Sequence, residues 1–240
     1  MRKITISGYT DTGRTRSSNE DCILCMPDIQ AAVLADGMGG HSAGEVASRT
    51  AVDTVSAILR QTLRGISAHE RLETALQAAH SVIREKSRQS IKYRGMGTTC
   101  VAALVTDSRM HFANVGDSRL YLLRNGAFSA LTHDHSLLQE FIDQGLYTPE
   151  EAREKVSRNI LTRALGLEPQ VKVDYDAVDI RPGDRFLMCS DGLYDMLSES
   201  EMAALLGRPH QHEEIGLDMI ELANARGSRD NVSVITFTGF

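Results

Sequence analysis

The chain has 240 residues, and its 42% of hydrophobic and 24% of charged residues exclude a largely disordered or collagen-like protein. Lysines and arginines number 26 against 32 aspartates and glutamates, which gives a net charge of −6. This balance creates no overall positive field to attract nucleic acid or an anionic membrane, so we expect neither as a partner.

The sequence contains no apolar stretch that approaches the roughly 20 residues of a membrane-spanning helix, so we expect no membrane insertion. Residues 1–5 do not lead into the apolar core of a signal peptide, and we therefore expect a cytoplasmic protein. Cys22 and Cys25 form a Cys-x-x-Cys pair, but the run around them is typical of a strand, in which positions three apart face opposite sides. We expect two small buried side chains here, not a zinc or redox site.

Apolar runs of two kinds alternate in blocks along the chain. Short runs rich in β-branched and aromatic residues predict strands, and longer runs with apolar residues at i, i+3 and i+4 predict amphipathic helices. Turns at Asp107-Ser108 and Asn125-Gly126 divide a meander of strands over residues 98–131. In chain order, we expect strands at 4–9, 22–26 and 31–35, helices at 43–64 and 68–90, strands at 98–105, 111–115, 120–123, 171–178 and 186–189, helices at 199–206 and 213–225, and a strand at 232–237.

This block order predicts an α+β fold of antiparallel sheets with helices on their outer faces. Because no repeat or low-complexity linker divides the sequence, we expect one domain over residues 1–240. Segment 139–166 fits neither pattern, since it is polar and is broken by Gly145, Pro149 and Gly166. We expect this segment to form a mobile flap beside a site.

Two of the predicted strands end in the same way, in Asp36-Gly37 and in Asp191-Gly192. A buried strand holds its terminal carboxylate rigidly at the sheet edge, and the glycine permits a tight turn and lets a ligand approach the main chain. Asp21 and Asp230 lie at the heads of two further strands. One Asp-Gly alone is usually only a turn, but four acids at converging strand ends would bring about −4 of charge into one place.

Two divalent cations would cancel that charge, and oxygen ligands without a nearby histidine or cysteine favour magnesium or manganese. Such a pair of ions can hold a shared water, lower its pKa and neutralise the oxygens of a phosphoryl group. Phosphate ester hydrolysis is therefore the leading chemistry. Arg16 could hold two phosphate oxygens or be a solvated loop residue, and His41 could protonate the leaving oxygen or merely begin a helix.

His133 and His135 form a His-x-His pair that could suggest another metal site. The pair lies in a loop, however, where Asp134 and Ser136 are typical of a turn residue and a helix N-cap. We therefore expect no ligand role for these two histidines.

Seven short motifs run in order from near the start of the chain to near its end. They are Arg16-x-x-Asn19-Glu20-Asp21, Asp36-Gly37-Met38-Gly39-Gly40-His41, Gly97-Thr98-Thr99, Asn114-Val115-Gly116-Asp117-Ser118-Arg119, Leu161-Thr162-Arg163-Ala164-Leu165-Gly166, Ser190-Asp191-Gly192-Leu193-x-Asp195 and Asp230-Asn231. Together they resemble the metal-dependent serine/threonine protein phosphatases of the PP2C type, in their bacterial branch. Seven ordered motifs over almost the whole chain are far more specific than an isolated Asp-Gly.

The resemblance implies a four-layer αββα sandwich, in which two antiparallel sheets are flanked by antiparallel helix pairs, with segment 139–166 as the flap. It also implies two central Mn2+ or Mg2+ ions per subunit, and a third, weaker ion at Asp117 with Asp195 in support. Arg16 would grip the phosphate. His41 would donate the proton, as in bacterial relatives, because Met38 stands where eukaryotic members have a histidine. The central ions would be held by Asp21, Asp36, Asp191, Asp230 and the main-chain carbonyl of Gly37, with Glu20 acting through water and Asn231 in support.

The implied function is hydrolysis of phosphoserine and phosphothreonine on proteins, in opposition to a bacterial serine/threonine kinase. A monomer is the default expectation, since composition indicates nothing about the oligomeric state. Two alternatives stay open from the sequence. One is a phosphatase-like regulatory binding module whose catalytic site has decayed. The loss of metal-binding aspartates would indicate such a module. The other is a two-metal phosphatase of nucleotides or small phosphate esters, which would differ in the groove around the flap.

Overall fold

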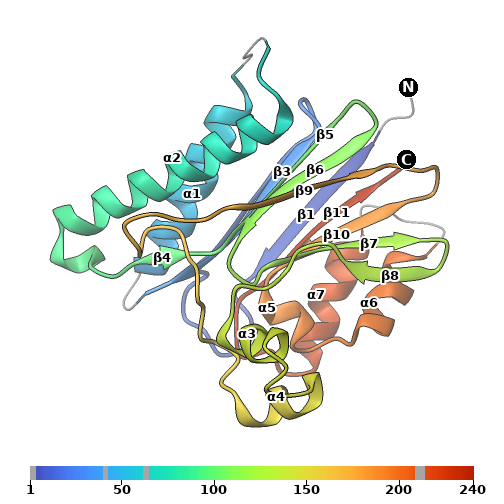
Figure 1. Ribbon diagram of the computed structural model, residues 1–240. Helices are drawn as coiled ribbons and strands as arrows, with labels where there is room; N and C mark the ends of the chain where they lie inside the picture. The colour runs from blue at the N-terminus through green and yellow to red at the C-terminus, as the bar shows by residue number, and fades with distance from the viewer. Residues whose placement is uncertain (1–3, 40–42, 62–64, 209–213) are drawn as a thin grey trace.

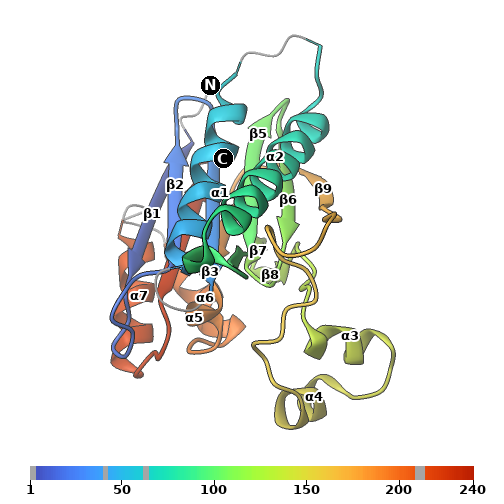
Figure 2. The same cartoon turned by 90° about the vertical axis from the view of Figure 1, so that its left-hand side faces the viewer.

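The structure is a computed structural model that describes residues 4–39, 43–61, 65–208 and 214–240. Two antiparallel sheets lie face to face in its middle, and helices cover both outer faces (Figures 1 and 2). This arrangement confirms the predicted α+β class and the αββα sandwich.

Each sheet combines strands from distant parts of the chain. The first sheet has the strand order β1-β11-β10-β7-β8, and the second has the order β2-β3-β5-β6-β9, with β4 beside β3. The strands of the first sheet are β1 (Thr5–Asp11), β11 (Val232–Thr238), β10 (Arg185–Cys189), β7 (Arg119–Arg124) and β8 (Ala127–Ala130). Those of the second are β2 (Asp21–Met26), β3 (Ala31–Met38), β4 (Gly97–Thr98), β5 (Cys100–Thr106), β6 (Arg109–Val115) and β9 (Asp174–Asp179).

Two long helices, α1 (Ala43–Leu59) and α2 (Ala68–Gln89), cover the second sheet, while α6 (Glu199–Leu206) and α7 (Ile215–Ala225) pack on the first. Helix α1 buries Ala47, Ala51 and Val55 at four-residue spacing, because these positions lie on one helical face. Helix α2 starts with a capping box in which Ser67 and Glu70 each accept a main-chain N–H from the other. Two shorter helices are η1 (Ile91–Tyr93) and α5 (Asp191–Tyr194).

Three apolar layers hold the sandwich together, one under each helix pair and one between the sheets. In the middle layer, Leu34 and Phe112 of the second sheet pack in one cluster with Phe186 of the first. Cys22 belongs to the layer under α1 and α2, whereas Cys25 packs against the middle layer. Cys22 and Cys25, which are both free thiols, therefore face opposite sides of β2 as predicted, but only Cys22 is buried and Cys25 is half-buried.

The predicted elements appear with shifted ends. The helix predicted at 43–64 ends at Leu59, and the strand predicted at 171–178 begins only at Asp174. The two predicted turns are confirmed, since Asp107 and Ser108 have φ values of 51° and 59°, and Asn125 has a φ of 51°. Such left-handed backbone matches the twist of a two-residue hairpin.

The predicted flap at 139–166 contains two seven-residue helices that apolar periodicity did not predict, although Ser136 was expected to be an N-cap. The flap segment is taken below as residues 137–166, because the first of these helices begins at Leu137. Helix α3 (Leu137–Asp143) follows the N-cap Ser136, and α4 (Pro149–Lys155) follows a capping box formed by Thr148 and Glu151. Both helices extend from the sandwich on the same side (Figure 2). They are stabilised by their caps and bury almost no apolar stripe, so periodicity gave no signal for them.

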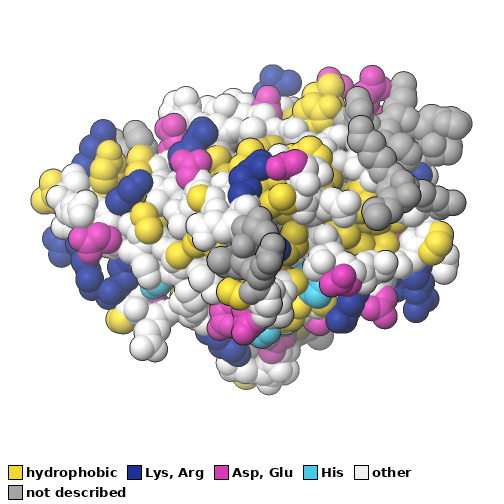
Figure 3. Space-filling model, turned by 90° about the horizontal axis from the view of Figure 1, so that it is seen from above, with side chains coloured by type: hydrophobic (Ala, Val, Ile, Leu, Met, Phe, Trp, Pro, Cys, Tyr) yellow, Lys and Arg dark blue, Asp and Glu magenta, His cyan; other side chains and the backbone are white. Residues whose placement is uncertain are grey.

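No helix in the four described ranges combines the length and the apolarity that a membrane crossing requires. On the face seen from above, side chains of lysine and arginine are interspersed with those of aspartate and glutamate (Figure 3). Mixed charges of this kind create no extended field of one sign over the described part of that face.

The glycines that follow Asp36 and Asp191 are needed for a reason that differs from the prediction. Neither Gly37 nor Gly192 has a positive φ, so the explanation by a tight turn is wrong. A Cβ atom on Gly192 would lie 2.0 Å from the carbonyl oxygen of Asn231, and one on Gly37 would lie 2.1 Å from that of Gly44. These glycines let neighbouring main chains approach closely, which brings the acid-bearing segments together.

We predict that Gly192→Ala lowers the free energy of unfolding by about 2–3 kcal/mol, because main chain on both sides must shift to admit the methyl group. Thermal unfolding monitored by circular dichroism measures this change. Gly207→Ala is the matched control, since its Cβ would be 3.1 Å from the nearest atom. An equal loss in both variants would contradict the close-approach explanation.

Candidate metal centre

The four acids that end or begin strands come from both sheets and lie near the same edge of the sandwich. Asp21 and Asp36 are directly opposite each other in the β2–β3 ladder. Asp191 begins α5 two residues after the end of β10, and Asp230 lies two residues before β11, the strand that pairs with β10. Each sheet therefore contributes two carboxylates.

Asp21 is held across the interface between the sheets. Its Oδ2 accepts hydrogen bonds from Ser190 Oγ at 2.8 Å and from Ser233 Oγ at 2.6 Å, both from the first sheet. Its Oδ1 is buried and, within the described residues, has no hydrogen-bond partner. Burial raises the pKa of Asp21 to about 6, although the two serine hydroxyls lower it. One oxygen is thus anchored and the other is left for a ligand.

Asp36 lies at the electrostatic centre of the group. Burial raises its pKa well above the usual value, and repulsion by other carboxylates raises it further. The repelling groups are Asp21, Asp191, Asp117 and Asp230. Its main chain is fixed by Thr99, whose Oγ1 accepts from the Asp36 N–H at 2.9 Å.

Asp191 repeats the features of Asp21. Its Oδ1 is buried without a hydrogen-bond partner among the described residues. Burial raises its pKa well above the usual value, and repulsion from Asp117, Asp230 and Asp21 raises it further. Mutual repulsion therefore shows that the predicted acids share one region.

Gly37, Glu20 and Asn231 connect these acids to the surrounding main chain. The Gly37 N–H donates to the Glu20 carbonyl at 3.1 Å, and burial raises the pKa of the Glu20 carboxyl. Asn231 accepts from the Glu20 N–H at 2.8 Å and donates to the carbonyls of Thr12 and Ser18. Asn231 thus holds the loop that carries Glu20 in place.

Arg16 lies at the exposed rim of the group. Its Nη2 donates to Asp230 Oδ2 at 2.8 Å, and about half of its side chain is exposed. This hydrogen bond raises the pKa of Arg16. A guanidinium has five N–H donors, so Arg16 keeps donors for a phosphate while it contacts Asp230.

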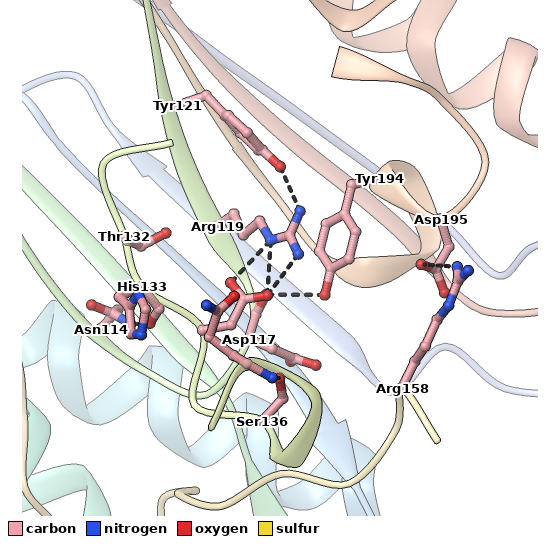
Figure 4. A network of polar contacts seen from close by, with 12 residues as sticks. Asn114, Asp117, Arg119, Tyr121, Thr132, His133, Ser136, Arg158, Tyr194 and Asp195 are labelled. Carbon is pink, nitrogen blue, oxygen red and sulfur yellow. Dashed lines mark hydrogen bonds and ion pairs between the residues drawn. The ribbon is translucent and has the colours of Figure 1, made fainter. Parts of the chain in front are cut away.

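Asp117 lies in the turn between β6 and β7, directly after Gly116, whose φ is 105°. Burial raises the pKa of Asp117 to about 7, and the nearby Asp134 contributes to the rise. Asp117 and Asp191 line a cavity of about 750 Å3 between α5 and the flap segment. Arg158 of the flap segment and Asp195 also line it and form an ion pair at 3.3 Å (Figure 4).

The predicted histidines divide into two cases. His41 lies outside the described residues. His133 contacts Asp143 at 2.7 Å, and the buried His135 accepts from the Gly116 N–H at 3.1 Å and contacts Asp174 at 3.2 Å. Each loop histidine thus has its own carboxylate partner, and Ser136 caps α3 as expected.

Sequence patterns did not predict Ser190 and Ser233 as part of the site, although both contact Asp21. Ser190 had a local signal, since it directly precedes the Asp191-Gly192 pair. Ser233 had none, because its contact with Asp21 depends on how β11 packs against β2.

The donor set fits hard divalent cations. All the candidate groups offer oxygen atoms, and two of the acids have a buried oxygen that lacks a partner in the described chain. Among the described residues, no three acidic, histidine or cysteine side chains are already gathered as closely as ligands around one ion. A bound divalent cation would offset the mutual repulsion of these acids.

Comparisons with known proteins agree with this geometry. The sequence profile of the family described as protein phosphatase 2C matches residues 14–231. The serine/threonine phosphatase stp of Listeria innocua is 42% identical over 236 residues, which cover 94% of this chain and 92% of that protein. The serine/threonine phosphatase of S. agalactiae has a solved structure with a TM-score of 0.92 and 34% identity, covering 99% of this chain and 100% of the other.

A further solved structure is that of the catalytic domain of the serine/threonine protein phosphatase PstP in complex with two manganese ions. It has a TM-score of 0.88 and 35% identity, and the match covers 98% of this chain and 97% of that one. Two packed sheets with acids at their common edge thus define a class of metal-dependent hydrolase. The chain belongs to the protein phosphatase 2C family.

We predict that the metal-free protein becomes less stable as the pH rises from about 4 to about 7. Asp21 and Asp117 have pKa values of about 6 and about 7 in the folded state, against 3.8 for the usual group, so the folded state binds more protons in this window. Stability must then fall with increasing pH. In excess chelator, we expect the melting temperature to drop by on the order of 5 °C between pH 5 and pH 8.

Added Mn2+ should abolish this drop, and Asp21→Asn should reduce it, because an amide does not ionise. Differential scanning calorimetry gives the melting temperature of the metal-free wild type, the wild type with Mn2+ and metal-free Asp21→Asn. A metal-free melting temperature that rises over the same pH range would contradict the prediction.

Proposed function

We propose that this protein hydrolyses phosphoserine and phosphothreonine esters on proteins, with two Mn2+ or Mg2+ ions held by Asp21, Asp36, Asp191 and Asp230. The observation that carries the proposal is the set of buried, mutually repelling carboxylates at the common edge of the two sheets. The names of the relatives support the substrate class, and the two manganese ions of the PstP domain support the metal.

Each residue has a defined part in this proposal. The bound cations would supply a water of lowered pKa and neutralise phosphoryl oxygens. Acids from both sheets raise the pKa of Asp36, so its carboxylate would help to hold the cations. Gly37 would offer its carbonyl, Arg16 would hold phosphate oxygens at the rim, and His41 would protonate the leaving oxygen.

A third, weaker cation would lie at Asp117, with Asp195 in support. Both side chains line the cavity between α5 and the flap segment. Burial and the nearby Asp134 raise the pKa of Asp117, and a bound cation would lower it. The flap segment would contact the phosphorylated protein. Glu20 would act through water, and Asn231 would keep the Glu20 loop in position.

The biological setting is also a proposal. We infer a single catalytic domain over residues 1–240 that works as a monomer in the cytoplasm and opposes a serine/threonine kinase of the same bacterium. The regulatory-module alternative is not favoured, because all four aspartates are present and brought together. The assay below distinguishes activity on small phosphate esters from activity on phosphoproteins.

We predict that Asp36→Asn and Asp191→Asn each lower phosphate release from a phosphothreonine peptide by at least about a hundredfold, since each removes charge from the cation site. Both variants should stay folded, and their metal-free melting temperatures should rise because repulsion is relieved. Release from nucleotides should be much slower than from the peptide, and chelator should stop both reactions.

Asp53→Asn, on the exposed face of α1, is the matched control and should keep full activity. Full activity of Asp36→Asn or Asp191→Asn in Mn2+ would overturn the proposed function. Faster turnover of nucleotides than of phosphopeptides would change the substrate class and leave the metal centre intact.

For Arg16→Ala, we predict a rise of about ten- to hundredfold in the KM for phosphopeptide, because a charge-assisted contact to phosphate is lost. The KM of Arg16→Lys should lie between those of the wild type and Arg16→Ala, because lysine keeps the charge but lacks the planar guanidinium group. Steady-state kinetics measure the effect. Arg14→Ala, two residues away and also exposed, is the control, and an equal effect there would argue for a general charge effect.

A further inference from the structure

Helix α5 carries an acid at its start and an aromatic anchor at its end. Asp191 is its first residue, and Tyr194, one turn later, directs its hydroxyl toward Asp117 (Figure 4). Tyr194 Oη donates to the main-chain oxygen of Asp117 at 3.1 Å, since a carbonyl oxygen only accepts. This hydrogen bond ties the β6–β7 turn to the helix that begins with Asp191.

The ring of Tyr194 is itself held by a fixed guanidinium. Arg119 lies over the ring, with Cζ 3.7 Å from the ring centroid. Arg119 in turn binds both carboxylate oxygens of Asp134 and donates from Nη1 to Tyr121 Oη at 2.8 Å. A ring stacked on a locked guanidinium has little freedom, so its hydroxyl is aimed at one place.

Asp117 and Asp191 need such a connection because they repel each other. Both line the cavity beside the flap segment, and Asp117 is the strongest charged neighbour acting on Asp191. Gly116 and Ser118 of the same turn are held by hydrogen bonds to His135 and Thr99, whereas the Tyr194 hydroxyl ties the main chain of Asp117 itself to α5. The turn contains Gly116, which restricts the main chain least.

We propose that Tyr194 is a positioning residue that holds Asp117 beside Asp191 and thereby sets the affinity of the third, weaker cation. The proposal rests on the proposed function, in which Asp117 binds that cation. In this role Tyr194 acts through its hydrogen bond to the main chain of Asp117.

Titration of the full chain with Mn2+ in an isothermal calorimeter tests this role. Tyr194→Phe keeps the ring over Arg119 and removes only the hydroxyl. We expect the weakest binding step to weaken by about threefold to tenfold, the loss of one hydrogen bond, while the two tighter steps stay unchanged. In phosphopeptide assays, the Mn2+ concentration for half-maximal rate should rise, and kcat at saturating Mn2+ should recover.

Tyr121→Phe is the matched control. It removes the other phenol that contacts Arg119, and no contact with Asp117 is lost. Arg119 keeps its hydrogen bonds to both carboxylate oxygens of Asp134 in this variant, so we expect its Mn2+ titration to match the wild type. An unchanged weak step in Tyr194→Phe, an equal weakening in Tyr121→Phe, or a weakening of all three steps would overturn the inference.

Asp117→Ala separates the two proposals. If the weak step is absent from the wild type or survives in Asp117→Ala, the third-cation assignment fails and takes the role of Tyr194 with it. If Asp117→Ala removes the weak step and Tyr194→Phe leaves it intact, only the role of Tyr194 fails. Melting temperatures close to that of the wild type establish that each variant is folded.

Discussion

At its acid-bearing edge, the sandwich is organised around the repulsion between buried carboxylates. The pKa of Asp36 is raised by burial and by four other acids, which come from strands and turns of both sheets. Such an arrangement costs free energy in the metal-free protein, and the apolar layers on either side must offset that cost. Divalent cations would convert the same repulsion into attraction, which couples metal binding to the stability of the fold.

Much of the fold followed from local patterns in the sequence. The i, i+3, i+4 spacing in α1 and α2 and the short apolar strands predicted the layers, because both periods reflect a face that must be buried. Asp-Gly at two strand ends and acids at the heads of two others predicted one acidic centre, and the structure brings those carboxylates together. Seven ordered motifs predicted the family, and the family match confirms it.

Other features depend on contacts between distant segments and could not be predicted from local patterns. The contacts of Ser190 and Ser233 with Asp21 arise only when the sheets pack together. Gly192 is required by the carbonyl of Asn231, which is 39 residues away in the chain, and not by its own backbone angles. The helices of the flap segment were missed because caps, not apolar stripes, stabilise them. His41 lies outside the described residues, so its part in the reaction stays a prediction.

The ion pair between Arg158 and Asp195 has a consequence for how a large substrate could reach the acids. Both side chains are partly exposed, and pairs of this kind contribute only about 0–1 kcal/mol, which is comparable to thermal energy. Dissolved salt weakens them further, since screening acts within about 8 Å at physiological ionic strength. Arg158 could therefore leave Asp195 at little cost when a phosphoprotein approaches, while the main-chain hydrogen bonds between Leu165 and Thr98 keep the end of the flap segment on the sandwich. Access and chemistry would then respond separately to the ionic composition of the cell.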